Sequence, residues 1–97
     1  MREEIITYEL IKKGVKPHLQ GFKFLVNAVD IYIDYYKNPL PIIQIYEMVS
    51  EDYGVNYTNV ERNIRNARLN AKKEFKKMSN AEFISRVAID LIFKKEA

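Results

Sequence analysis

Residues 49–67 read VSEDYGVNYTNVERNIRNA, and this stretch decides the fold that we expect. A helix that begins near Pro41 has a natural end at Gly54, because glycine adopts the left-handed conformation that closes many helices. Residues 58–61 read TNVE, which matches a capping box and predicts that the next helix starts at Thr58. The apolar positions around this turn are filled by Val49, Val55 and Val60. The stretch therefore predicts a helix-turn-helix motif.

The second helix of this motif is predicted to run from Thr58 to about Met78. Apolar side chains recur in it at steps of three and four residues, which places them in one stripe that faces the core. The stripe consists of Val60, Ile64, Ala67, Ala71, Phe75 and Met78. The other faces of this helix are expected to be exposed.

The rest of the chain also shows helical patterns. We expect a short helix over about residues 3–13, ended by Gly14, and a long helix over about residues 17–36. The long helix is apolar on two faces, which predicts that it lies between its neighbours. Residues 79–82 read SNAE, a second capping box, and begin a last helix that reaches to about residue 94.

With 97 residues, 47% of them hydrophobic, the chain is long enough for a single domain spanning residues 1–97 and too short for a second one. No segment shows a convincing strand alternation. The sequence therefore predicts an all-α fold, a compact helical bundle of about five helices. Its core is expected to include Tyr53 and the group Tyr32, Tyr35 and Tyr36, with base stacking as the less favoured role of that group.

Several functional classes find no support in the composition. The chain has no cysteine, which removes disulfides and cysteine-ligated metals. His18 is the only histidine, and the three glycines stand apart, so we expect no metal site and no phosphate-cradling glycine loop. We also expect no catalytic residues and no cofactor. Since no signal peptide or membrane span is recognisable, a cytoplasmic protein is expected.

The charges are concentrated in one part of the chain. Residues 62–77 contain seven basic side chains and a single acidic one, Glu74. Such a density indicates a polyanionic partner rather than an ordinary solvated helix face. On a helix that advances about 100° per residue, one flank carries the basic side chains and the other carries asparagines. Arginine and asparagine read guanine and adenine in the major groove, so this helix is expected to enter DNA.

Three blocks of the chain resemble one known family. Residues 14–22, GVKPHLQGF, resemble an opening GVPAHIKGY, and residues 60–67, VERNIRNA, resemble a recognition helix VERAIRHA. Residues 80–84, NAEFI, followed by Val87 and Ala88, resemble the last helix of the same domain. The family is the C-terminal DNA-binding effector domain of the response regulator that initiates sporulation in spore-forming bacteria.

This resemblance implies a transcription regulator that binds double-stranded DNA at a short element like TGTCGAA, often in tandem, with a homodimer on tandem sites as one arrangement. Glu61, Arg62 and Arg65 occupy the family's recognition positions, where a carboxylate suits cytosine and an arginine suits guanine. Base reading is therefore expected from Asn59, Glu61, Arg62, Arg65 and Asn66. Phosphate contacts are expected from Thr58, Arg68, Lys72, Lys73 and Lys76.

The sequence departs from the family in three ways. Asn59 and Asn66 stand where an arginine and a histidine are usual, which favours adenine-containing steps. Met78 leads directly into the capping box, without the family's segment implicated in contacting RNA polymerase sigma factor, so that contact is not expected. The usual receiver domain does not precede Gly14, which suggests an excised domain or one that works without phosphorylation.

A function from another class stays open beside DNA binding. Ile89 and Phe93 fall opposite the expected buried face of the last helix. The chain would then be a protein-interaction module, or a decoy that pairs with a full-length regulator through these two side chains.

Overall fold

The computed structural model describes residues 2–93, and every regular element in that part of the chain is a helix. The prediction of an all-α bundle is confirmed, with one more helix than expected among the described residues. In chain order the helices are α1 (Arg2–Lys12), α2 (Gln20–Asp34), α3 (Ile42–Tyr53), α4 (Tyr57–Leu69), α5 (Lys73–Lys76) and α6 (Asn80–Phe93).

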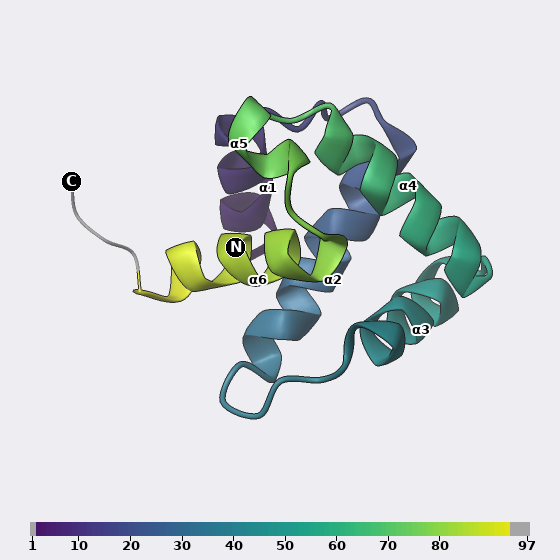
Figure 1. Ribbon diagram of the computed structural model, residues 1–97. Coiled ribbons are helices and arrows are strands. Elements are labelled where there is room, and N and C mark those ends of the chain that lie inside the picture. Colours follow the sequence, from purple (N-terminus) through teal and green to yellow (C-terminus); the bar gives the residue numbers. More distant parts are fainter. Residues whose placement is uncertain (1, 94–97) are drawn as a thin grey trace.

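Helix α2 forms the centre of the bundle (Figure 1), where it packs against α1, α3, α4 and α6. Both of its apolar faces are used, as the sequence predicted: Phe24, Leu25, Ala28 and Val29 are fully buried. The helix is shorter than predicted, because Leu19 before it is extended, with φ −76° and ψ 145°. Proline at position 17 thus lies in the preceding turn and not in the helix.

The backbones of α2 and α4 approach each other most closely at Gly21. A β-carbon built on Gly21 would lie 2.0 Å from the carbonyl oxygen of Asn63 and 3.1 Å from the β-carbon of Ala67. No side chain can occupy that space without moving one of the two helices. The absence of a side chain at Gly21 therefore lets α4 rest directly on α2.

Helix α3 has the bounds that its flanking residues predict. It starts directly after Pro41 and ends at Gly54, whose φ of 68° and ψ of 32° are the left-handed values expected there. The amide of Val55 donates to the carbonyl of Ser50 across this end, at 3.1 Å. The predicted turn residue is confirmed.

Two tyrosines expected in the core are largely exposed. Tyr35 is 43% exposed and Tyr53 is 40% exposed, although the Tyr53 ring meets Phe24 edge-on with 5.3 Å between the ring centroids. Both residues lie at the end of a helix, where fewer side chains surround the ring. The buried side of α3 consists of Ile45, Tyr46 and Val49.

The prediction that one helix continues from Thr58 to about Met78 is wrong. Helix α4 ends at Leu69, and the extended Lys72, with φ −60° and ψ 154°, separates it from the short α5. The Lys72 amide donates to the carbonyl of Lys13 at 3.0 Å, at the end of α1, instead of continuing the α4 hydrogen-bond ladder. The predicted apolar stripe still faces the core on both sides of the break, because α5 turns Phe75 inward, where it is 3% exposed.

The second capping box is confirmed at the start of α6. The Ser79 amide donates to the Glu82 carboxylate at 2.8 Å, and the Glu82 amide donates to the Ser79 hydroxyl at 3.1 Å. The predicted end of this helix at residue 94 lies outside the described residues.

We expect Gly21→Ala to lower the free energy of unfolding by about 2 kcal/mol or more, because the added methyl group overpacks the contact with Asn63. This loss exceeds the gain of up to about 1 kcal/mol in helix propensity. Gly54→Ala is the matched control, since its new β-carbon meets nothing within 4 Å and costs only the strain of a positive φ. Urea unfolding of both variants, followed by circular dichroism, tests this. A smaller loss for Gly21→Ala than for Gly54→Ala would contradict the close approach.

Candidate nucleic-acid interface

Helices α3 and α4 are joined by residues 54–56 and form the predicted helix-turn-helix (Figure 1). The start of α4 differs from the predicted capping box. Its N-cap is Asn56, whose side-chain oxygen accepts from the Asn59 amide at 2.9 Å, while the Thr58 hydroxyl donates to the same oxygen at 2.7 Å. Asn56 is extended and lies two residues before Thr58, so it reaches the free amides of the first turn instead.

The inner face of α4 is fixed by the core. Val60, Ile64 and Ala67 have no exposed surface, which commits the opposite side of the helix to solvent. The predicted base-reading residues lie on the solvent side. Arg62, Arg65 and Asn66 are exposed, and Asn59 and Glu61 are half-buried.

Glu61 and Arg65 are brought together on the surface of α4. An Arg65 guanidinium nitrogen lies 2.6 Å from a Glu61 carboxylate oxygen. The Arg65 side chain is 44% exposed and the Glu61 side chain is 34% exposed. Ion pairs between residues four apart on an exposed helix are weak, about 0.3–0.5 kcal/mol. This pair therefore holds an acceptor and a donor side by side and gives them up readily to a ligand.

Some side chains of the asparagine flank of α4 are already hydrogen-bonded within the helix. The flank consists of Asn59, Asn63, Asn66 and Asn70. The Asn63 side-chain amide donates to the carbonyl oxygen of Asn59 at 2.9 Å and to its side-chain oxygen at 3.0 Å. The Asn70 side-chain amide donates to the backbone carbonyl of Asn66 at 2.8 Å. No hydrogen bond within residues 2–93 involves the Asn66 side chain. Of the two asparagines predicted to read bases, Asn66 is the one whose amide is free in this part of the chain.

Arg68 is not on the surface, contrary to the prediction. Its side chain is 6% exposed, and its guanidinium donates to the side-chain oxygen of Asn80 at 3.0 Å and to the carbonyls of Phe75 and Lys76 at 3.3 Å and 3.0 Å. Burial lowers the pKa of the Arg68 guanidinium from its ordinary value. The prediction failed because it assumed a straight helix, whereas α5 and the start of α6 fold back over Arg68. With 6% of its surface exposed and two of its nitrogens bonded inside the protein, this group is poorly placed to bind a phosphate.

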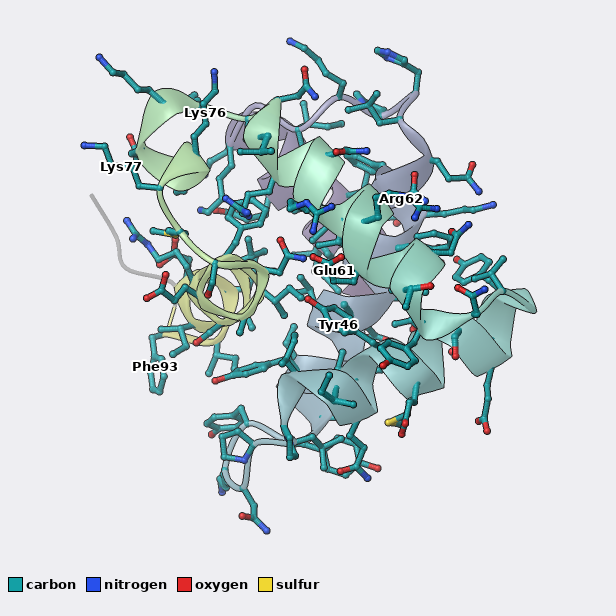
Figure 2. All side chains as sticks on the ribbon, turned by 45° about the vertical axis from the view of Figure 1, so that its right-hand side comes forward. Tyr46, Glu61, Arg62, Lys76, Lys77 and Phe93 are labelled. Carbon is teal, nitrogen blue, oxygen red and sulfur yellow. The ribbon has the colours of Figure 1, made fainter. Side chains whose placement is uncertain are left out.

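The three predicted phosphate-binding lysines are all exposed, but they lie on the short turn of α5 and not along α4. Lys72 precedes α5, and Lys73 and Lys76 are its first and last residues. Figure 2 shows Lys76 and its neighbour Lys77 together at the end of α5, well away from Arg62 on α4. None of the ion pairs within residues 2–93 involves these lysines. The candidate interface thus has two parts. One is the outer face of α4, and the other is the turn that carries Lys72, Lys73 and Lys76, which we name the lysine turn.

Two residues that the sequence analysis missed hold this arrangement. Asn56 had a recognisable signal, because an asparagine directly before a helix is a common N-cap. Asn80 had none: its side-chain amide donates to the hydroxyl of Tyr46 at 3.0 Å and to the carbonyl of Glu61 at 3.2 Å, across three helices. Burial raises the pKa of the Tyr46 hydroxyl above its ordinary value.

The two side chains proposed for a protein-interaction module point outward, as expected. Ile89 is 41% exposed and Phe93 is 60% exposed, and the Phe93 ring meets Tyr36 edge-on with 6.3 Å between centroids. Tyr32 is half-buried and shares a hydrogen bond of 3.1 Å with the Ser85 hydroxyl.

Among the described residues, no helix has both the length and the apolar character needed to cross a membrane.

A comparison with known families matches most of this domain. The family model described as the sporulation initiation factor Spo0A C terminal matches residues 6–71. The match covers two of the three blocks noted in the sequence, residues 14–22 and 60–67, and stops before α5. No curated protein matches the chain.

The cap of α4 can be tested by a pair of substitutions. We expect Asn56→Ala to lower the free energy of unfolding by about 1 kcal/mol, because it removes the acceptor of the Asn59 amide. The control, Thr58→Ala, is expected to change it by less than about 0.5 kcal/mol, as for a surface substitution. Urea titrations of both variants measure the difference. A larger loss of unfolding free energy for Thr58→Ala than for Asn56→Ala would show that Thr58 is the cap, as the capping box predicted.

Proposed function

Because the chain belongs to the family of sporulation initiation factor Spo0A C-terminal domains, we propose that it is a sequence-specific, double-stranded DNA-binding transcription regulator with α4 as its recognition helix. The family is one of DNA-binding effector domains of the sporulation regulator. The observation that carries the proposal is the outer face of α4, which presents Glu61, Arg62 and Arg65 from the second helix of a helix-turn-helix. In such motifs the second helix enters the major groove and the first crosses the backbone.

The chemistry of this face suits a CG step. The Glu61 carboxylate can accept from cytosine N4, and an arginine can donate two hydrogen bonds to O6 and N7 of guanine. Because the Glu61–Arg65 pair already holds the two groups 2.6 Å apart, both reach adjacent base edges from one position on the helix. Asn66, and Asn59 once its oxygen is released from Asn63, provide the amides that match adenine.

Phosphate contacts are proposed for groups at both ends of this surface. Thr58 lies in the first turn of α4, where backbone amides and the helix dipole favour anions. Lys72, Lys73 and Lys76 provide the cations on α5. This set omits Arg68, whose donors are used inside the protein. A regulator of this kind acts on the chromosome, and thus in the cytoplasm of a bacterial cell.

The exposed apolar side chains of α6 favour a second candidate function. Ile89 and Phe93 leave apolar surface uncovered on α6. The C-terminal end of the α6 ribbon lies on the opposite side of the view from the turn between α3 and α4 (Figure 1). Large exposed apolar side chains that lie together often mark protein contacts. A homodimer on tandem DNA sites, or pairing with a full-length regulator, would use this surface without displacing α4.

The proposal predicts both a sequence motif and a salt dependence. Selection of bound duplexes from a random pool should enrich one short motif with a CG step. If Lys72, Lys73 and Lys76 neutralise three phosphates, the logarithm of affinity should fall with the logarithm of salt concentration with a slope of about −2.7, at roughly −0.9 per phosphate. Absence of an enriched motif together with a slope near zero would refute the DNA-binding proposal and favour the interaction module.

Base reading and phosphate binding can be separated by two alanine variants. Arg62→Ala should weaken binding to the selected duplex by about 1–3 kcal/mol and relax the preference at one base pair. Lys76→Ala should weaken binding to all duplexes about equally and make the salt slope shallower by roughly one. Binding curves on a selected and a scrambled duplex at two salt concentrations measure both effects. If Lys76→Ala changed the base preference and Arg62→Ala did not, the assignment of the two parts would be reversed.

A further inference from the structure

The segment that follows the family match is attached to the recognition helix by a group of side-chain hydrogen bonds. The match ends at Ala71, whereas α5 and α6 continue the chain and pack on α4. Arg68 in the last turn of α4 and Asn80 at the start of α6 are 6% and 7% exposed, and they are joined by a hydrogen bond of 3.0 Å. Hydrogen bonds from a charged donor are stronger than neutral ones, and burial excludes competing water.

A second nitrogen of Arg68, Nη1, is directed at α5. This nitrogen donates to the carbonyls of Phe75 and Lys76, at 3.3 Å and 3.0 Å. A helix of four residues is not stable alone, because nucleation costs more than its few hydrogen bonds return. The lysine turn therefore has its conformation only because the protein holds it, through Arg68, the buried Phe75 ring and the bond from the Lys72 amide to Lys13.

Asn80 accepts from Arg68, and its own side-chain donor is directed at the helix-turn-helix. Its amide nitrogen donates to the Tyr46 hydroxyl on α3 and to the carbonyl of Glu61, which is one of the proposed base-reading residues. Arg68, Asn80 and Tyr46, which we name the polar junction, thus connect α3, α4, α5 and α6. No fully buried side-chain nitrogen or oxygen in the described residues lacks a hydrogen-bond partner, those of the junction included.

We infer that Arg68 and Asn80 are positioning residues, which hold the α5 lysines in a fixed place relative to the base-reading face of α4. Lys72, Lys73 and Lys76 then contact the phosphate backbone beside the groove that α4 occupies, in one register with the bases. This inference rests on the proposed function and adds to it the means by which the two parts of the interface act together. Neither positioning residue touches the DNA.

The test removes the polar junction without removing any lysine. In the variant Tyr46→Phe/Arg68→Met/Asn80→Leu, every polar side chain of the junction becomes apolar at similar size, so no buried polar side chain loses its partner. Its control is Lys72→Gln/Lys73→Gln/Lys76→Gln, in which the junction is intact and the exposed charges are removed. Both are compared with the wild-type chain in salt titrations on the selected duplex, after unfolding curves establish that each variant is folded.

We expect the two variants to behave alike. Each should bind at least about tenfold more weakly at low salt and lose most of the slope of about −2.7 that the three lysines contribute, while the enriched base motif is unchanged. Amide exchange at residues 73–77 should be faster in the junction variant than in the wild type, and exchange in α4 should not change. A purely structural role of the junction would not reduce the salt slope of a folded protein that keeps all its lysines.

Different results separate this inference from the proposed function. A folded junction variant with the wild-type slope would overturn the inference and leave DNA binding intact. A wild-type chain with no slope and no motif would refute the proposed function itself. Should the junction variant fail to fold, the single variant Arg68→Lys takes its place, because a lysine keeps the charge but lacks the planar group that meets Asn80 and the α5 carbonyls together. A wild-type slope in this variant would overturn the inference, and a shallower slope would support it.

Discussion

The contact between α2 and α4 at Gly21 is the constraint on which the rest of the structure depends. A β-carbon at this position would lie 2.0 Å from the Asn63 carbonyl oxygen, so the two helices touch at the level of their backbones. Because α2 is also packed against α1, α3 and α6, the position of α4 is set from one side by a rigid centre. The outer face of α4 then follows from its inner face, which places Arg62 and Arg65 in solvent.

The basic side chains divide into two classes according to what surrounds them. Arg68 donates to three oxygens inside the protein, and these hydrogen bonds connect α4 with α5 and α6. The α5 lysines are exposed and enter no ion pair within residues 2–93, so their charges remain for an anion. Arginine suits the buried place, since its planar group meets several acceptors at once and holds its proton. Net charge alone does not distinguish these two roles.

The capping box predicted at Thr58 is not the cap of α4, which is Asn56. Thr58 and Glu61 have the spacing of a capping box, but Asn56 lies closer to the turn after Gly54 and accepts the Asn59 amide. Glu61 is then free to pair with Arg65 on the outer face. The choice between the caps affects the interface directly, because a Glu61 side chain folded back on Thr58 would not be available for a base.

Features fixed by neighbours along the chain could be predicted from the sequence alone: the helical class, the left-handed turn at Gly54, the capping box at residues 79–82 and the inward stripe of α4. The break after α4 could not be predicted, because it depends on a hydrogen bond from the Lys72 amide to the Lys13 carbonyl, far away in sequence. That bond turns α5 back over Arg68 and buries a side chain that a continuous helix would expose. Local periodicity shows which face of a helix is apolar, but α4 has no terminating glycine, and the packing of distant segments decides where it ends.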